Sequence, residues 1–500
     1  HVIFENMKTR VRFAPSPTGP LHIGGLRTAL FNYLYAKKNK GVFILRMEDT
    51  DQNRYVDGSE VYIQESLEWC GLLPDEGPKN GGDFGPYRQS ERKGLYEKYI
   101  QILINNGSAY YAYDSPEELA IAREKSAKKG ETFVYGSQNR HLFKNSLTKS
   151  SIDKDKIASG DYVIRLKVEP ECEINVFDEI RGSIKVSSNL VDDKILMKAD
   201  GMPTYHFANV VDDKLMKIST VIRGEEWLPS LPLHKLIYDA FGWEAPKFMH
   251  LPLILKPNGG GKLSKRDGDK GGYPVFPIKW NSETTGFRES GFLSKAVVNY
   301  LALLGWNNGD EREIFSLSEL VNCFNSTGIQ KGGARFDYEK AKWINHQYIA
   351  KTNSNDLLQL PETQKLLKGF NKEKQFKILA LVKERIYTLG DLKNETSFII
   401  KPFPYDEKSV RKLKKNNPEK ILNKVIEVLK ADKEITGFKE ELLNWASQNK
   451  VNIGTLMQSL RLSFVGRLTG PDVFDICTLL GKDVSLKRVQ RLLKHLSLSK

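Results

Sequence analysis

The residues best suited to chemistry in this chain begin near its start, in the stretch RFAPSPTGPLHIGG from Arg12 to Gly25. The apolar segment Val11–Ala14 is typical of a strand, the prolines that follow exclude a helix, and apolar residues return at helical spacing after Gly25. A strand, a tight turn and a helix in this order offer free backbone N–H groups and a positive helix dipole to a phosphate. The alternative is an ordinary Pro/Gly turn, in which His22 would have no chemical role.

A second stretch of this kind is GGGKLSKRDGDKGG, residues 259–272. Its glycines predict a mobile loop, and the positive charges of Lys262, Lys265 and Arg266 would attract phosphate. A flexible basic surface loop is the alternative when the stretch is considered by itself.

The elements that must position these residues begin with a predicted β–α–β unit between Val11 and Glu48. The segment VFILRMEDTD, residues 42–51, has the pattern of a buried strand that ends in acids. Such a unit has a right-handed crossover and binds its ligand beyond the carboxyl ends of the strands. Glu48 falls at such an end, where a carboxylate could hold an ammonium group. A helix cap or a solvated loop acid is the alternative.

The pattern beyond this unit predicts an α+β insertion, then a return of strands, then helices. Residues 109–191 are irregular, with strands at YVIRLKV and SIKVSS and a helix capped by Ser115. We expect strand-like structure over Lys194–Asp213 and strands at Ser219–Ile222 and HLPLILKPN. Beyond Lys351 nearly every segment has helical periodicity, which predicts an all-helical final third.

The chain is long and unevenly charged. Its 500 residues exceed what one hydrophobic core holds, so we expect several domains. Residues 351–500 contain 29 lysines and arginines against 17 acids, a net charge of +12, which leaves +2 of the total of +14 for the rest. This distribution favours a polyanion bound by the final third, with solvated lysine-rich helix faces as the alternative.

The four cysteines lie far apart and form no CxxC pair, so we expect no structural zinc and a reducing, cytoplasmic location. One of them, Cys70, has the surroundings of a core residue. The sequence contains no uncharged apolar run of membrane-spanning length, and we expect no membrane partner. We also expect the native chain to start at Met7, with residues 1–6 added to it.

Two motifs, taken together, carry a resemblance to a known family. His22-Ile23-Gly24-Gly25 and KLSKR, residues 262–266, resemble the HIGH and KMSKS motifs of class I aminoacyl-tRNA synthetases. The stretches RFAPSPTGPLHIGG, LRMEDTD, GPYRQSER, DGMPTYHFANVVDD and VIRGEEW resemble the bacterial-type glutamyl-tRNA synthetases more narrowly. The resemblance extends from Lys8 to Lys500 and is weakest after Lys351. Gly25 in place of histidine and the KLSKR wording are variations that this family tolerates.

The resemblance implies a glutamate–tRNA ligase with an α/β fold. It implies a Rossmann-like catalytic domain split by an α+β insertion and followed by an all-helical anticodon-binding region. The implied reaction joins L-glutamate and ATP, with Mg²⁺, into glutamyl-adenylate and then moves the glutamyl group to the terminal adenosine of tRNA(Glu). The implied catalytic residues are His22, Lys262 and Lys265. The implied ATP-binding residues are Pro15, Ser16, Thr18, Gly19, His22, Gly24, Gly25, Lys262, Ser264 and Lys265.

The resemblance also implies a glutamate pocket. Arginine suits bidentate capture of a carboxylate, so Arg12 and Arg223 would hold carboxylates, while Glu48 would hold the amino group. The full implied set is Arg12, Ala14, Ser16, Glu48, Tyr205, Asn209 and Arg223. Without the family, Arg223 would be expected to pair with Glu225 or Glu226.

The resemblance divides the chain and assigns its tRNA contacts. Arg385, in VKERIYTL, matches an arginine used on an anticodon base, and we expect a monomer. The segment 273–287 looks like extra length, which we expect to form a hairpin near the mouth of the site. The expected parts are the first catalytic half at 7–90, the acceptor-end insertion at 91–193, the second catalytic half at 194–272, a stem-contact region at 273–350 and the anticodon-binding region at 351–500.

Several alternatives stay open at this stage. Glutaminyl-tRNA synthetases share the catalytic half but typically have a neutral residue at the position of Arg223 and a β-barrel anticodon region. A shortened synthetase-like enzyme that glutamylates a tRNA base lacks the final third, and small nucleotidylyltransferases lack a distant KLSKR. A tRNA-binding paralogue without catalysis is the non-enzymatic alternative. The sequence does not decide whether tRNA(Gln) is also a substrate.

Overall fold

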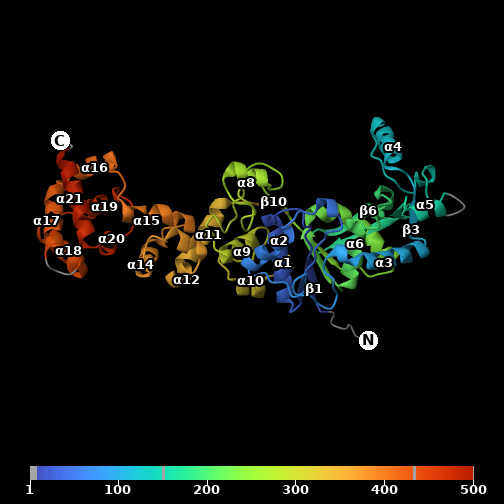
Figure 1. The fold of residues 1–500 in the computed structure, drawn as a ribbon, viewed down its shortest axis with the longest axis horizontal. Coiled ribbons are helices and arrows are strands. Elements are labelled where there is room, and N and C mark those ends of the chain that lie inside the picture. Colours follow the sequence, from blue (N-terminus) through green and yellow to red (C-terminus); the bar gives the residue numbers. More distant parts are fainter. Residues whose placement is uncertain (1–7, 149–152, 432–434, 499–500) are drawn as a thin grey trace. The chain divides into compact units, whose positions relative to one another are not determined.

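The computed structural model describes residues 8–148, 153–431 and 435–498, and the chain divides into two compact units (Figure 1). The first unit comprises His1–Phe287 and Val297–Tyr338, and the second comprises Arg288–Ala296 and Glu339–Lys500. The expectation about Met7 and residues 1–6 lies outside the described residues. Among the residues described, no helix is both long and apolar enough to cross a membrane.

The first unit is built on the β–α–β unit that the sequence predicts. Strand β1 (Arg10–Phe13) pairs in parallel with β2 (Val42–Leu45), and α1 (Ile23–Lys38) connects them. Both strands are buried along their whole length, because α1 covers them and β8 (Thr220–Gly224) lies beside β1. The N–H of Ser219 donates to the carbonyl of Arg10 over 2.9 Å, which joins the two parts of the sheet.

The second part of the sheet has the strand order β6–β5–β9–β8. Strands β8 and β9 (Lys247–Leu251) run parallel, and β9 is also parallel to β5 (Glu173–Asp178), whereas β6 (Gly182–Ser187) is antiparallel to β5. The register places Arg223 opposite His250. Residues opposite each other on paired strands share a face of the sheet, so these two side chains are neighbours.

The strand-like expectation for Lys194–Asp213 is wrong over its second half. Only β7 (Ile195–Met197) is a strand, and Tyr205–Leu215 is the helix α6. Pro203 ends the extended segment, and Thr204 takes the N-cap position. The apolar residues of α6 face the core, while Tyr205, Asn209 and Asp213 recur every four residues, a helical spacing that places them on one face.

The remaining elements of the first unit include a small antiparallel sheet and flanking helices. Its order is β3–β4–β7, and Ser115 forms the predicted capping box at the start of α4. The elements are α2 (Ser59–Trp69), α3 (Lys93–Asn105), β3 (Ala109–Ala112), α4 (Pro116–Lys128), α5 (Lys154–Ser159), β4 (Val163–Leu166), α7 (Leu231–Ala240), β10 (Ile254–Leu255), α8 (Lys265–Gly271), α10 (Leu317–Cys323) and β11 (Ala334–Arg335). Cys70 is buried, as its sequence surroundings indicate.

The segment 273–287 is not the expected hairpin. Its one bridge, between Phe276 and Gly286, is parallel, and the rest of the segment is irregular. It packs instead against two distant elements. The Ile278 carbonyl accepts from the Tyr62 hydroxyl over 2.5 Å, and the Val275 carbonyl accepts from the N–H of Ile23, at the start of α1, over 3.0 Å. These long-range contacts take the place of local strand pairing. We call residues 273–287, which lie against the first unit in this way, the strap.

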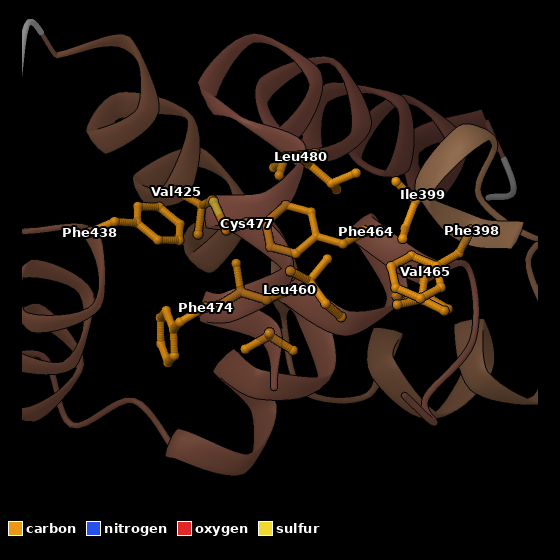
Figure 2. Close-up of a cluster of buried hydrophobic side chains, with 14 of the residues drawn as sticks. Phe398, Ile399, Val425, Phe438, Leu460, Phe464, Val465, Phe474, Cys477 and Leu480 are labelled. Carbon is orange, nitrogen blue, oxygen red and sulfur yellow. The ribbon is translucent and has the colours of Figure 1, made fainter. Parts of the chain in front are cut away.

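The described residues of the second unit form helices joined by loops, with no strand among them, which confirms the prediction for the final third. Helices α9 (Ser294–Leu303) and α11 (Tyr338–Lys351) connect the two units along the chain. The other helices are α12 (Ser354–Leu358), α13 (Pro361–Leu366), α14 (Lys372–Val382), α15 (Leu392–Ile400), α16 (Glu407–Lys414), α17 (Pro418–Lys430), α18 (Phe438–Gln448), α19 (Ile453–Val465), α20 (Val473–Leu480) and α21 (Lys482–Leu498). Figure 2 shows part of their shared core, with the Phe464 ring directed toward Cys477.

A buried arginine on α21 joins two helix ends beside this core. Arg488 donates to the carbonyls of Phe398 and Ile399, in the last turn of α15, over 2.7 and 3.0 Å. It also donates to the carbonyl of Phe464, in the last turn of α19, over 2.5 Å. The last carbonyls of a helix have no partner within the helix, so the fork of one guanidinium satisfies both ends. Burial lowers the pKa of Arg488 to about 10, and the group stays charged at neutral pH.

We predict that Arg488→Leu loosens the ends of α15 and α19, because three buried carbonyls lose their donor. Each unsatisfied buried group costs roughly 1–3 kcal/mol. Hydrogen exchange of the full chain, followed by mass spectrometry, should show faster exchange in both helices. Lys487→Leu, at an exposed position on the same helix, is the matched control. Equal protection in Arg488→Leu and wild type would contradict the role of Arg488.

Candidate active site

A cavity of about 360 Å³ lies where the strands of the first unit end. Residues that follow β1 and β2, the end of β8, the start of α1 and one face of α6 line it. All seven residues of the predicted glutamate pocket are among its lining residues: Arg12, Ala14, Ser16, Glu48, Tyr205, Asn209 and Arg223. Members of this predicted set that are up to 211 positions apart in the sequence therefore meet at one cavity.

A buried network of charges forms one wall. Arg12 donates to both oxygens of Asp213 over 2.9 and 3.1 Å. Arg46 donates to Asp213 over 2.8 Å and to Glu48 over 3.0 Å, and Asn209 donates to Glu48 over 2.9 Å. Burial by itself would raise the pKa of Asp213, but the two arginines outweigh it and the pKa falls below the usual range. The charge of Arg12 is therefore already balanced by the protein.

Glu48 is less completely compensated than Asp213. Burial raises its pKa, and the opposing effects of Arg46, Arg12 and Asn209 do not cancel that shift. A cation that entered the cavity beside Glu48 would favour the ionised carboxylate. The geometry thus suits an ammonium group.

The second arginine, Arg223, has neutral partners. Its Nε donates to His250 Nε2 over 3.0 Å, and one terminal nitrogen donates to the Tyr205 hydroxyl over 3.1 Å. The acids that follow it in the sequence pair elsewhere, Glu225 with Arg181 and Glu226 with Lys262. Pairing of Arg223 with either acid, the alternative that the sequence left open, is therefore not what the structure contains.

His22 lies where the predicted phosphate turn meets the cavity. Its Nδ1 accepts from the N–H of Gly24 over 3.2 Å, so His22 caps α1. Its Nε2 is buried and has no hydrogen-bond partner among the described residues. Burial, followed by the nearby charge of Lys262, lowers the pKa of His22 to about 4. The imidazole is neutral at physiological pH, with one nitrogen still available to a ligand.

The other residues of the predicted ATP set divide into two groups. Pro15, Ser16, Gly24, Gly25 and Lys262 line the same cavity as His22. Thr18, Gly19, Ser264 and Lys265 are not among its lining residues. Thr18 lines a neighbouring cavity of about 290 Å³, Gly19 takes a turn conformation with φ +138°, Ser264 caps α8, and Lys265 is the exposed first residue of α8.

Arg385, the predicted anticodon contact, lies in the second unit and is not a lining residue of the cavity. It is partly exposed, and its Nε lies 3.3 Å from an oxygen of Glu395.

Sequence reasoning missed the two residues that hold the charged wall, Arg46 and Asp213. Their signals were present, since Arg46 is two positions before Glu48 on an extended segment and Asp213 is four after Asn209 on a helix.

No group of three or more His, Cys, Asp or Glu residues that could hold a metal ion occurs in the described ranges. A nucleotide would bring its own Mg²⁺, which usually keeps several waters and binds through phosphates. The donor set at the cavity, with the neutral imidazole of His22 and the ammonium of Lys262, suits phosphate oxygens.

A strand–helix–strand unit with HIGG at the start of its helix, and KLSKR beside the same cavity, is the arrangement of a class I aminoacyl-tRNA synthetase. The family model described as tRNA synthetases class I (E and Q), catalytic domain, matches residues 8–343, and an anticodon binding domain matches residues 344–493. The chain belongs to this family of glutamate and glutamine synthetases. Its fold is the class I catalytic domain with a Rossmann-like sheet, followed by an anticodon-binding domain.

Relatives that match over nearly the whole chain are named as glutamate–tRNA ligases. The glutamate–tRNA ligase of Flavobacterium johnsoniae is 51% identical over 499 residues, which cover 98% of this chain and 99% of that protein. That of Porphyromonas gingivalis is 47% identical over 506 residues, with 98% and 99% coverage. The crystal structure of a glutamate tRNA ligase from Elizabethkingia meningosepticum, in complex with its amino acid, matches with a TM-score of 0.92 and 46% identity. That match covers 98% of this chain and 100% of the other.

Proposed function

We propose that this chain is a glutamate–tRNA ligase, which activates L-glutamate with ATP and transfers the glutamyl group to the 3′ terminal adenosine of tRNA(Glu). Relatives that share about half of its residues over its full length have this activity in their names. The observation that carries the proposal is the cavity itself. Its lining includes the buried arginines Arg12 and Arg223, the buried carboxylate of Glu48 and the HIGG turn, which together match the charges of an amino acid with two carboxylates and those of a nucleotide.

The amino acid would lie against the strand ends. Glu48 would hold its ammonium group, since the carboxylate is buried and only partly compensated. Arg12 and Arg223 would face its two carboxylates. Tyr205 and Asn209, which touch Arg223 and Glu48 respectively, would complete the pocket.

ATP would lie over the HIGG turn. In the activation step one oxygen of the glutamate α-carboxylate attacks the α-phosphorus, the bond to the bridging oxygen breaks, and pyrophosphate leaves. The protein contributes mainly position and charge stabilisation to such a step. His22 would donate from Nε2, because its Nδ1 already accepts from Gly24. Lys262 would exchange its partner Glu226 for phosphate, and Lys265 would act after α8 moves toward the cavity.

Residues 351–500, the main part of the second unit, would bind the anticodon region of tRNA. Their excess of positive charge suits a polyanion, and loop bases are read by hydrogen bonds and by stacking on arginine. Residues 91–193, in the first unit, would bind the acceptor end, and residues 273–350, which belong partly to each unit, would contact the stem. We further propose that the enzyme acts as a monomer in the cytoplasm. Whether it also charges tRNA(Gln) stays open.

Two observations favour this function over its nearest rivals. Arg223 is a cation at the position where a glutaminyl enzyme typically has a neutral residue, and the final third is helical. A side-chain amide would leave the buried charge of Arg223 without a counter-ion, which is costly. A tRNA-binding protein without catalysis would have no need for Lys262 and His22 at a cavity of this kind.

The test is ATP–pyrophosphate exchange by the full chain with glutamate, with and without tRNA(Glu). We expect tRNA-dependent exchange and charging of tRNA(Glu). Lys265→Ala should lower the exchange rate ~10²–10³-fold, the usual effect of losing one transition-state donor, with little change in tRNA affinity. Equal losses of exchange and tRNA binding would contradict the role of Lys265, and absence of exchange and charging in wild type would leave only the binding protein.

Glu48 predicts a pH dependence of glutamate binding. Because burial raises its pKa, Glu48 loses its charge at a higher pH than an ordinary carboxylate, so the KM for glutamate should rise as pH falls. Glu48→Gln should raise that KM roughly 10- to 100-fold, as expected for a hydrogen bond to a charged group, and should flatten its acid limb. Glu60→Gln, which removes a partner of Arg88 outside the cavity, is the control. An unchanged acid limb in Glu48→Gln would reject the assignment.

Arg385 predicts a base-specific effect. Arg385→Ala should reduce charging of tRNA(Glu) variants unequally, with the loss concentrated at one anticodon base and roughly 1–3 kcal/mol in size. Arg411→Ala removes an exposed arginine of the same unit that also pairs with a glutamate and serves as the matched control. A uniform loss over all anticodon variants would indicate a phosphate contact instead.

A further inference from the structure

Arg223 is held by a chain of hydrogen bonds that runs away from the cavity. Its Nε donates to His250 Nε2 over 3.0 Å, and the other ring nitrogen of His250 lies 2.7 Å from Asp178 Oδ2. Both His250 and Asp178 are fully buried, with no exposed surface. His250 is on β9 and Asp178 is on β5, so the three side chains cross three adjacent strands.

This geometry fixes the tautomer of His250. Asp178 can only accept when ionised, so the proton lies on Nδ1 and Nε2 presents its lone pair to Arg223. Asp178 cannot rotate to another partner. Its Oδ1 accepts from the N–H groups of Ile180 and Arg181 over 2.9 and 2.8 Å, and its Oδ2 also accepts from the N–H of His250 over 3.1 Å.

A second imidazole faces Arg223 from α7. His234 Nδ1 lies 3.4 Å from a terminal nitrogen of Arg223, and its Nε2 lies 3.1 Å from His206 Nδ1. With Nδ1 accepting from the guanidinium, His234 carries its proton on Nε2. Burial lowers the pKa of both His234 and His250, which agrees with two neutral acceptors.

The two arginines of the predicted glutamate pocket, Arg12 and Arg223, are thus held in opposite ways. Arg12 is clamped by a carboxylate, Asp213. Arg223 is oriented by imidazole, hydroxyl and carbonyl groups, and among the described residues none of its hydrogen bonds goes to a carboxylate. A carboxylate would orient Arg223 equally well but would also neutralise it.

We propose that Asp178 and His250 form a positioning pair that aims Arg223 into the cavity while leaving its positive charge for the substrate's side-chain carboxylate. The proposal rests on the proposed function, since it assigns this pair to the choice of glutamate over glutamine. A buried charge without a counter-ion penalises an empty or amide-filled pocket. Selectivity therefore depends on neutral partners for Arg223 as much as on Arg223 itself.

The experiment compares variants of His250 in the full chain by tRNA-dependent ATP–pyrophosphate exchange. His250→Phe keeps the volume and removes the acceptor. His250→Gln offers an amide oxygen near the position of Nε2. Met249→Leu, on the same strand with its side chain toward the opposite face, is the matched control. The readouts are the KM for glutamate, the KM for ATP and the ratio of kcat/KM for glutamate and glutamine.

We expect His250→Phe to raise the KM for glutamate about tenfold or more, the loss expected for one hydrogen bond to a charged group. The KM for ATP should stay within about twofold, and the preference for glutamate should fall. His250→Gln should recover most of both losses. Asp178→Asn, which would donate to Nδ1 and move the proton to Nε2, should behave like His250→Phe although His250 is intact.

Other outcomes overturn the proposal. If His250→Phe does not fold, the comparison of His250→Gln with Asp178→Asn decides, because only a positioning role requires them to differ. Similar changes in both KM values, or no rescue by His250→Gln, would make the pair merely structural. Failure of the proposed function is distinguishable, since wild type would then show no glutamate-dependent exchange at all.

Discussion

The Asp213 carboxylate is the contact on which the first unit depends. It accepts from Arg12 at the end of β1 and from Arg46 just after β2, and it belongs to α6, far along the chain. One group thereby fixes a helix to two parallel strands. Removing one partner of such a buried pair leaves an uncompensated charge and typically costs ~3–5 kcal/mol. The same contact sets the cavity wall, since Arg12, Glu48 and Asn209 take their orientation from this network.

The network also explains why the two ends of the cavity differ in charge. On the side of α6 the positive and negative groups are paired before any ligand arrives. On the side of β8 the positive charge of Arg223 is surrounded by neutral hydrogen-bond acceptors. The proposed ligand, with two carboxylates and one ammonium, fits this asymmetry, because the Glu48 carboxylate is only partly compensated and Arg223 is held by neutral partners.

Much of this arrangement could be predicted from the sequence because its signals are local. The β–α–β unit follows from apolar runs around the Pro/Gly turn, and the helical final third follows from periodicity. The glutamate set could be named only through resemblance, and the cavity that unites its members depends on strand pairings between distant segments. The helix α6 was mistaken for extended structure because its apolar residues cluster, although Tyr205, Asn209 and Asp213 carry a helical period. A hairpin is the wrong prediction for the strap, because its contacts with Tyr62 and Ile23 join residues far apart in the sequence and leave no signal in the local sequence pattern.

The strap has a consequence for the lysines of the KLSKR motif. Before α8, the N–H of Leu263 donates to the carbonyl of Ile254, and shortly after α8 the carbonyl of Val275 accepts from Ile23. The segment that contains α8 is therefore anchored on both sides, to the strand β10 before the helix and to the first turn of α1 after it. Lys265, the first residue of α8, lies between these two anchors, so any approach of its side chain to the cavity would have to occur with both ends of the segment held. The short chain on either side leaves little room for the helix to slide.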